Sequence, residues 1–546
     1  MIGPGKPIMA TTATFSALLL VGGGLTSATA SSATDARLGP FTWGEKTHVA
    51  DAGWGRMIRL ADDRYLCVEA RFPRPNSLLE LKLSDDNART WTTVGEVTEP
   101  GRNLDNGEIL QLPSGDILLT GRSVVSSRVI GSVQSYHLPV YRSGDFGKTW
   151  TFQSQVDMSE PPPYQKGQPS MGLWEPHFFL LPDGKLACAY ANEKHALDQR
   201  VSYSQVVSEC VSGDSGVTWG PEIVVAAQVG GGNQRPGMPV MTRLRDGKFA
   251  TVFEVVGIGD ADVYYKTSVD GVTWDPGIGT RVPCQRAGPW ITTLADGRLV
   301  VSSCTNRVSI SDDNGATWRL TTPPPWPDPD GHLVFTWPAI YQISPTEIAV
   351  MKTHDGVDIR WGQIAPPETW PSRFASDFRR SSDTGWTVYG GLGGVASSTY
   401  VLDGGVTTAK SLTGSSTWRD GVLEAELTLQ PVGSAGVLFR VTNADYAGPD
   451  AAAGYYAGLD TNGGVTLRRM GSHPADLARA TIAAGATGKP HRIRVALHGN
   501  HIAVYVDDIT RPTLSATDTA YPQGQVGVRA DHGKAGFTSV RWQSEK

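Results

Sequence analysis

A short polar motif recurs along the first 318 residues and limits the folds that this chain can adopt. Four full copies read SDDNARTW (84–91), SGDFGKTW (143–150), SGDSGVTW (212–219) and SDDNGATW (311–318), and a shortened copy reads SVDGVTW (268–274). Each copy joins turn-forming Ser, Asp and Gly to a Trp. Such a motif is a repeated active site, a metal site or a folding device, and its place among the predicted strands decides between these.

Between the copies lies a second repeat, in which an apolar run, a tight polar turn and another apolar run predict a β-hairpin. Its six occurrences are residues 58–70, 110–122, 179–191, 242–254, 292–304 and 341–353. Six units of about four strands each predict an all-β, six-bladed β-propeller over residues 40–365. Residues 41–50 are expected to supply the strand that completes the last blade, which leaves no sheet edge exposed.

The order of the strands assigns the polar motif to one face of the propeller. In a four-stranded antiparallel blade, the turn between strands one and two and the turn between strands three and four lie on the same face. The motif follows strand three, so it lies opposite the face where strand one begins and strand two ends. We therefore expect its Asp, such as Asp312, to bond its own turn and to serve stability rather than chemistry.

The pocket is expected on the other face, where two glutamates stand out. Glu175 in LWEPHFFLL and Glu254 in FATVFEVVG each interrupt an apolar run, where a charge is costly without a purpose. Each lies eight residues from the Asp of its hairpin turn, so both should reach the same height in adjacent blades. A glycosidase needs two such carboxyl groups. The alternative is that one or both glutamates pair with a nearby Arg.

Other polar and aromatic residues fall at the same strand ends. Carboxylates, aromatic rings and a few arginines that converge on one channel mouth indicate a sugar site. The candidates are Arg56, Glu69, Asp105, Asn106, Arg122, Trp174, Glu193, Arg235, Met238, Trp290, Trp337 and Tyr341.

The polar repeats resemble the Asp boxes of the sialidase superfamily. Within residues 40–365, the segments WEP, ANE, RPGMPV, VFE and WPAIY resemble the pattern of glycoside hydrolase family 93, which comprises secreted exo-α-1,5-L-arabinanases that release arabinobiose with retention. The resemblance implies that Glu175 and Glu254 are the catalytic pair and that Glu193 and Tyr341 assist them. It also implies substrate contacts for Arg56, Asn106, Trp174, Trp290 and Trp337. We expect Glu175 to be the acid/base and Glu254 the nucleophile, although the sequence leaves their order open.

An exo-α-sialidase is the nearest alternative. It would use three arginines to hold the sialic carboxylate, for which Arg56, Arg122 and Arg235 are candidates, and Tyr341 as nucleophile. However, GRMIRL stands where the usual RIP triplet opens the first blade, and no Asp offers itself as the acid. A second alternative is a non-catalytic glycan-binding propeller, which would leave the two glutamates unexplained.

The composition changes at a Pro-rich linker over residues 366–376, after which the polar motif stops. Residues 377–546 form a series of alternating strands with Gly and Asn turns, which predicts a β-sandwich of the jelly-roll type. This pattern resembles laminin-G and concanavalin-like modules, which implies a carbohydrate-binding module. A purely structural companion domain is the alternative.

The ends and the composition set the remaining expectations. Residues 1–33 have a Lys, a short apolar run and small residues, which is typical of a secretory signal peptide, so we expect a secreted, extracellular protein. A net charge of −6 disfavours nucleic acid, and no apolar run is long enough to span a membrane. The five cysteines should be structural, and no motif indicates a cofactor or a metal. We expect a monomer that acts on a polysaccharide such as arabinan.

Overall fold

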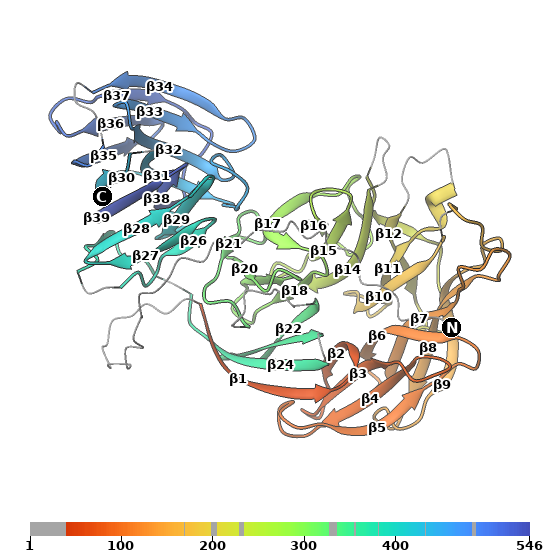
Figure 1. The fold of residues 1–546 in the computed structure, drawn as a ribbon. Coiled ribbons are helices and arrows are strands. Elements are labelled where there is room, and N and C mark those ends of the chain that lie inside the picture. Colours follow the sequence, from red (N-terminus) through yellow and green to blue (C-terminus); the bar gives the residue numbers. More distant parts are fainter. Residues whose placement is uncertain are drawn as a thin grey trace, which may run out of the picture. The chain divides into compact units, whose positions relative to one another are not determined.

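The computed structural model describes residues 40–545 apart from residues 169, 198–204, 229–233, 327–335, 354–355, 368, 380–381, 432 and 483–486. The predicted signal peptide lies outside the described residues. The chain is all-β, and it folds into a six-bladed β-propeller followed by a sandwich of two large antiparallel sheets (Figure 1). The fold class predicted from the sequence is confirmed.

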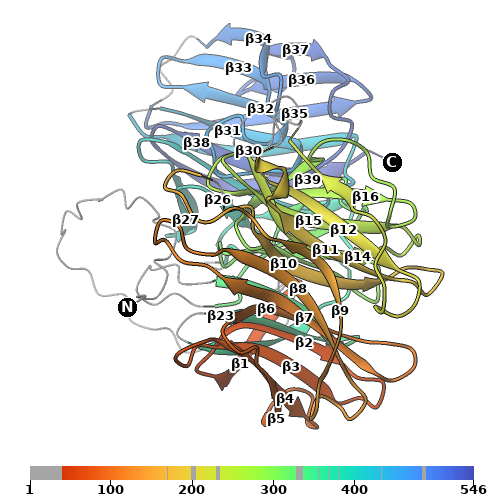
Figure 2. The same cartoon turned by 90° about the vertical axis from the view of Figure 1, so that its right-hand side faces the viewer.

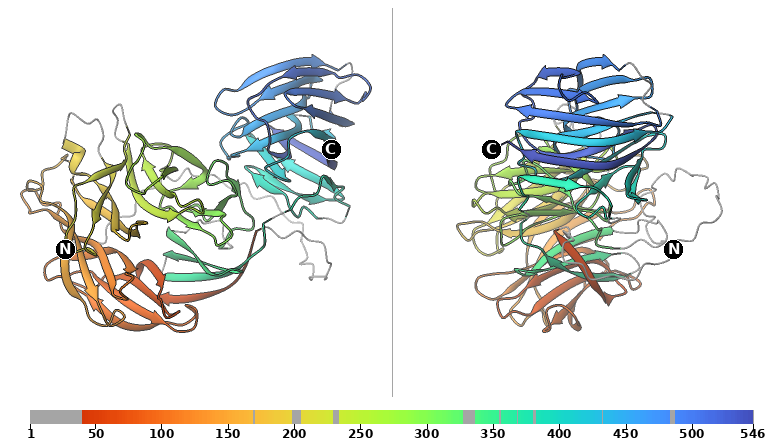
Figure 3. Two further views of the ribbon diagram at one scale, coloured as in Figure 1. Left: turned by 180° about the vertical axis from the view of Figure 1, so that it is seen from behind. Right: turned by 90° about the vertical axis from the view of Figure 1, so that its left-hand side faces the viewer.

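Each of the first five blades is a four-stranded antiparallel sheet in chain order, as Figures 1 and 3 show. Blade one contains β2 (Gly53–Arg59), β3 (Tyr65–Arg71), β4 (Leu78–Ser84) and β5 (Thr92–Val97). Blade two contains β6 (Asn103–Gln111), β7 (Ile117–Val125), β8 (Ser135–Ser143) and β9 (Thr151–Ser159). Blade three contains β10 (Leu173–Leu180), β11 (Leu186–Asn192), β12 (Val206–Ser212) and β13 (Ile223–Ala226).

Blade four contains β14 (Arg235–Arg243), β15 (Phe249–Val256), β16 (Asp262–Ser268) and β17 (Thr280–Arg286). Blade five contains β18 (Trp290–Thr293), β19 (Leu299–Ser302), β20 (Val308–Ser311) and β21 (Arg319–Leu320). Blade six contains β22 (Thr336–Ser344), β23 (Glu347–Thr353) and β24 (Val357–Ile364), and its outermost strand is β1 (Phe41–Ala50).

The strand β1 closes the ring, as the sequence predicted. It pairs antiparallel with β24, and Phe41 lies opposite Ile364 in this register. In Figure 1 the red strand β1 runs beside the green strand β24 although more than 300 residues separate them. The first and last strands of the propeller are thus held in one sheet, which removes an exposed edge.

The repeated polar motif is a self-contained turn, but its key residue differs from the one expected. In the fourth full copy, Asp313 accepts hydrogen bonds from the hydroxyl of Ser311 at 2.8 Å and from the backbone N–H and hydroxyl of Thr317 at 2.8 and 2.7 Å. Asp312 reaches only Arg319, at 3.4 Å. The expectation for Asp312 was therefore wrong by one residue. Asp313 holds the turn because it lies two positions after the Ser whose hydroxyl it binds.

The sandwich follows the propeller, and Figure 2 shows its strands. One sheet has the order β27-β28-β39-β30-β35-β36-β37, and β25 also pairs with β39. These strands are β25 (Arg373–Ser376), β27 (Leu392–Ala396), β28 (Thr399–Asp403), β30 (Gly421–Leu429), β35 (Pro490–His498), β36 (His501–Val506), β37 (Leu514–Thr517) and β39 (Lys534–Ser544). The strand β25 falls within the segment that the sequence assigned to the linker.

The other sheet has the order β26-β29-β38-β31-β32-β33-β34. Its strands are β26 (Thr387–Tyr389), β29 (Thr408–Thr413), β31 (Ser434–Thr442), β32 (Ala453–Asp460), β33 (Gly464–Arg469), β34 (Ala475–Thr481) and β38 (Gln525–Asp531). Alternate residues of both sheets, such as Leu423, Phe439, Tyr455 and Trp542, fill one apolar core between them.

All five cysteines are free thiols, and four of them are buried. Among residues 40–545 as described, no helix is long and apolar enough to cross a membrane.

Candidate active site

At or just before the innermost strand, each of the six blades has one residue in the same unusual backbone conformation. Each of these residues lies eight positions before a residue of the turn that joins the first two strands of its blade. Its φ is positive, between 45° and 54°. We call this set the mouth ring. Its members are Trp54, Asn106, Glu175, Met238, Gly288 and Trp337.

A β-bulge produces this conformation. In five blades the pairing of the first two strands slips at this point, as between Trp174 and His177 in blade three. The left-handed conformation costs a non-glycine residue about 1–2 kcal/mol, so its repetition indicates a purpose. Two residues further on, a second ring begins, which consists of Arg56, Glu108, His177, Val240, Trp290 and Ala339.

Four members of the mouth ring, all except Met238 and Gly288, line a cavity of about 740 Å³. Of the predicted residues, Asn106, Glu175 and Trp337 line it, together with the candidates Asp105 and Arg122. Trp54 and Phe72, which were not predicted from the sequence, also line it. Trp54 had a usable signal, because it shares with Glu175 the spacing of eight residues from the hairpin turn. Phe72 follows the end of a second strand and is 63% exposed, which gives the cavity an aromatic rim.

Glu175 is built to stay protonated near neutral pH. Burial raises the pKa of its carboxyl to about 8, and the neighbouring charge of Glu254 adds to this effect. Arg122, Arg235 and the backbone N–H of Met238 act in the opposite direction. A carboxylic acid that holds its proton can donate it to a leaving group.

Glu254 lies on β15 opposite Gly237, the residue before Met238 in the mouth ring. Its Oε2 accepts a hydrogen bond from the backbone N–H of Gly288 at 2.7 Å. Burial raises the pKa of this carboxyl, whereas Gly288 and the charge of Arg235 lower it. Each carboxyl group therefore has a backbone donor to its charged form, Gly288 for Glu254 and Met238 for Glu175. The two differ in that the negative charge of Glu254 adds to the burial that raises the pKa of Glu175.

Glu193 is tied to Arg235 rather than free. One of its oxygens pairs with the Arg235 guanidinium, and the other accepts hydrogen bonds from the backbone N–H of Gly172 at 2.8 Å and the hydroxyl of Ser170 at 2.5 Å. Arg235 also donates to Gln205 at 2.7 Å. The charge of Arg235 lowers the pKa of both Glu175 and Glu254. Glu193 therefore positions a guanidinium that affects both carboxyl groups.

Asp105 performs a similar task on the opposite side of the cavity. Its two oxygens accept hydrogen bonds from the backbone N–H of Asn106 at 2.7 Å and from the guanidinium of Arg122 at 3.0 Å. The first bond stabilises the left-handed backbone of Asn106, and the second directs Arg122 toward the cavity. Trp174 supports this arrangement from behind, since Arg122 lies over its ring at 4.6 Å.

Six of the nine predicted site residues do not line this cavity: Glu254, Glu193, Trp174, Arg56, Trp290 and Tyr341. Arg56 and Trp290 belong to the second ring, where the Arg56 guanidinium lies 5.0 Å from the Trp290 ring. Tyr341 lies deeper still, lines a cavity at the opposite channel mouth, and accepts a hydrogen bond from the N–H of Met57 at 3.1 Å. Glu69 is fully buried in blade one, 3.5 Å from the ammonium of Lys82, and does not line the cavity either.

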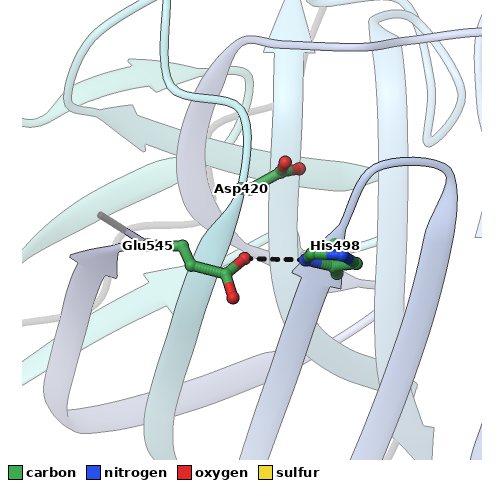
Figure 4. A group of neighbouring side chains, drawn as sticks. All are labelled: Asp420, His498 and Glu545. Carbon is green, nitrogen blue, oxygen red and sulfur yellow. Dashed lines mark hydrogen bonds and ion pairs between the residues drawn. The ribbon is translucent and has the colours of Figure 1, made fainter.

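One group of side chains could hold a metal ion among the described residues, and it lies in the sandwich (Figure 4). It consists of Asp420, His498 and Glu545. His498 already contacts Glu545 at 2.9 Å, and Asp420 accepts a hydrogen bond from the Arg440 guanidinium at 2.8 Å. A cationic guanidinium on one of three ligands does not fit a metal site, so these residues are better described as an ion-pair network.

Comparison with known families agrees with the fold. Residues 76–323 match a family model described as a BNR repeat-like domain, and residues 377–543 match one described as a 3-keto-alpha-glucoside-1,2-lyase-like domain. The first part of the chain is thus a propeller whose sequence matches BNR repeats. A curated relative, the levanase of Bacillus sp. (strain L7), is 33% identical over 121 residues, which are 22% of this chain and 13% of the levanase.

Several solved structures have similar folds. The family 93 α-L-arabinofuranosidase of Fusarium graminearum, in complex with arabinobiose, is 18% identical over 59% of this chain and 98% of its own, with a TM-score of 0.50. The arabinobiose complex of the Penicillium chrysogenum α-L-arabinanase is 20% identical with the same coverage and a TM-score of 0.49. The carbohydrate-binding module CBM66 from Bacillus subtilis is 21% identical over 29% of this chain and 94% of its own, with a TM-score of 0.26. The propeller thus has a fold similar to that of the family 93 α-L-arabinofuranosidase at low sequence identity.

Proposed function

We propose that this protein is an exo-acting glycoside hydrolase that releases arabinobiose from the end of α-1,5-L-arabinan with retention of configuration. The observation that carries the proposal is the pairing of Glu175, whose pKa is raised to about 8, with Glu254, which a backbone N–H stabilises in its charged form. A carboxyl group whose pKa is raised by burial and by the negative charge of a second carboxyl group suits the two tasks of a glycosidase.

In this mechanism Glu175 donates its proton to the glycosidic oxygen while the carboxylate of Glu254 attacks the anomeric carbon. The leaving chain departs as an alcohol, and the sugar is bound to Glu254 as an ester. The Glu175 carboxylate then takes a proton from a water molecule, whose oxygen attacks the anomeric carbon and frees Glu254. Both residues regain their starting states. Arg235, held by Glu193, would stabilise the negative charge as it moves between them.

The arginines favour a neutral sugar over a sialic acid. Arg122 is paired with Asp105, and Arg235 is paired with Glu193. Arg56 is only 4% exposed, and its guanidinium donates to the carbonyl oxygens of Gly55 and Trp337 at 2.8 and 3.1 Å. No member of this set is free to hold a carboxylate, which a sialidase requires. The burial of Tyr341 away from the cavity also argues against its use as a nucleophile.

Arabinan is the substrate suggested by the resemblance in the segments around Glu175, Glu254 and Trp337. The arabinobiose bound to the similar Fusarium and Penicillium enzymes agrees with this choice. An aromatic wall formed by Trp54, Trp337 and the exposed Phe72 would contact the apolar faces of sugar rings. The position of the cavity at the channel mouth suits attack at a chain end.

The deciding experiment is incubation of the protein with linear α-1,5-arabinan and, separately, with sialyl-lactose, followed by product analysis. Arabinobiose as the first product, formed in its retained anomer by NMR, supports the proposal. The double variant Glu175→Gln, Glu254→Gln serves as the inactive control. Free sialic acid with intact arabinan would overturn the assignment in favour of a sialidase.

We also propose that the protein is exported and that its sandwich binds the polysaccharide. The pattern of residues 1–33 supports export, and sequencing of the mature N-terminus from culture medium tests it. For the sandwich, the inactive double variant of the full chain is mixed with insoluble arabinan and excess arabinobiose, which occupies the propeller cavity. Persistent binding supports the role, and complete release by arabinobiose contradicts it.

A further inference from the structure

The second ring of the channel carries charged groups that the proposed reaction does not use. Blades one, two and three contribute Arg56, Glu108 and His177, which are 4%, 7% and 8% exposed. Blades four, five and six contribute Val240, Trp290 and Ala339, which are apolar or aromatic. Burial of three ionisable side chains on one side of a channel is costly unless they stabilise one another or serve a purpose.

These three groups form one connected set. The Nδ1 of His177 lies 3.4 Å from Oε1 of Glu108. The Arg56 guanidinium lies over the rings of Trp54 and Trp290 at 4.4 and 5.0 Å. No carboxylate pairs directly with Arg56 among the ion pairs of the described residues, but the negative charge of Glu108 acts on it through space. Glu108 is therefore the anion that offsets a buried cation.

A small cavity places this set directly beneath Glu175. It measures about 10 Å³, and Arg56, Glu108, Glu175 and His177 all line it. That volume is close to the smallest that can hold one water molecule. On its far side, Glu108 and His177 also line a cavity of about 820 Å³ at the opposite channel mouth. The charged groups of the second ring and Glu175 thus line the same gap, which is about the size of one water.

We propose that Glu108 is a positioning residue that keeps Glu175 protonated by offsetting the buried charge of Arg56 across the small cavity. The imidazole of His177 holds the Glu108 carboxylate in place. The functional meaning rests on the proposed role of Glu175 as the acid. The electrostatic relation itself belongs to the folded protein and exists without substrate.

The sign of the effect follows from the charges that face Glu175. Around it stand Arg56 from β2, Glu108 from β6, Arg122 from β7, His177 from β10, Arg235 from β14 and Glu254 from β15. Tyr341 from β22 adds a phenol beside Arg56. Removal of the Glu108 charge leaves Arg56 without its counter-charge, which favours the carboxylate form of Glu175 and lowers its pKa. Removal of the Arg56 charge has the opposite effect.

The test is a titration of the Glu175 carboxyl by ¹³C NMR in the full-length, ligand-free protein, with the signal assigned by its loss in Glu175→Gln. Glu108→Gln should lower the titration midpoint by about one pH unit, and Arg56→Gln should raise it by a similar amount. Glu108→Asp keeps the negative charge, so its titration midpoint should lie close to that of the wild type. The matched control is Glu209→Gln, which removes a fully buried carboxyl on β12 outside the channel and should leave the midpoint unchanged.

Opposite shifts in the two variants support the proposal, because a merely structural role would not give effects of opposite sign. If Glu108→Gln does not fold, the midpoint in Arg56→Gln decides alone. A midpoint that stays at the wild-type value in a folded variant overturns the proposal. A wild-type protein without activity on arabinan would refute the proposed function, yet the titration would still decide the role of Glu108.

Discussion

The charge of Glu254 raises the pKa of Glu175 from the neighbouring blade. The strand order explains how the two meet, because Glu254 lies opposite Gly237, and the next residue, Met238, directs its N–H toward the Glu175 carboxyl. The bulge that turns Glu175 into the channel recurs in blade four and brings Met238 to the same height. A repeated feature of the fold thus brings together two carboxyl groups that are 79 positions apart in the sequence.

Replacement of either glutamate by glutamine should abolish most of the activity. Glu175→Gln and Glu254→Gln keep the shape of the side chain but remove the group that titrates, so kcat/KM on arabinan should fall by about 10²–10⁴. Glu209→Gln is the control for loss of a buried carboxyl and should remain active. Azide added to the two alanine variants separates the roles, since the anomeric configuration of the azide product identifies the nucleophile. If both glutamine variants stay active, the catalytic pair is assigned wrongly, and Glu69, Asp105 and Glu193 become the candidates for the catalytic carboxyl groups.

The pH dependence of kcat/KM should be bell-shaped with its alkaline limb near pH 8. Glu175 must hold its proton to act as an acid, and it loses that proton as the pH rises through its pKa of about 8. Glu254 must be ionised, and burial raises its pKa, so the acid limb should lie above the usual range of carboxyl groups. Initial rates on arabinan between pH 4 and 10 provide the measurement. Full activity at pH 9.5 would contradict the role assigned to Glu175.

Much of the site was predictable from one spacing. Glu175 lies eight residues before Asp183, and the same spacing leads from Asp62 to Trp54, from Asp246 to Met238 and from Asp296 to Gly288. The periodicity of a strand could not tell whether Trp174 or Glu175 faces the channel, because a bulge of one residue reverses the alternation. Trp174 accordingly lies behind the cavity.

Depth along the channel and the choice of ionic partners were harder to predict. Tyr341 lies four residues after Trp337, which is about 13 Å along a strand, so it belongs to the level below the second ring. The pairing of Glu193 with Arg235 joins residues 42 positions apart, and no local pattern indicates it. Asp313 could have been found, because the motif Asp lies two positions after the Ser in every copy, as in Ser84 and Asp86.

Glu175→Gln should stabilise the protein in a pH-dependent manner. The folded state holds the Glu175 proton more tightly than the unfolded state, since burial raises its pKa to about 8. This contribution to stability is complete below the ordinary carboxyl pKa and is lost as the pH rises through about 8. Glutamine cannot ionise, so the variant does not lose this stability as the pH rises. Its Tm should therefore exceed that of the wild type by about 2 °C or more at pH 8. At pH 4.5 the two melting temperatures should be similar, and a difference of the same size at both pH values would contradict the argument.

Asp313→Ala should lower stability and leave the chemistry of the folded enzyme unchanged. The substitution removes three hydrogen bonds within one turn, from Ser311 and twice from Thr317, and should cost about 1–3 kcal/mol in the free energy of unfolding. Asp312→Ala is the matched control in the same motif. Asp312 contacts only Arg319 at 3.4 Å and is exposed, so its loss should change stability by less than about 0.5 kcal/mol.

Denaturant unfolding and steady-state kinetics on the four proteins, wild type, D313A, D312A and D312A/D313A, make the comparison. By strand order the turn between β20 and β21 lies on the face opposite the cavity, so kcat for the folded fraction should be the same in all four. A large loss of kcat in D313A at unchanged stability would place the motif on the face of the cavity and overturn the strand assignment on which the site depends.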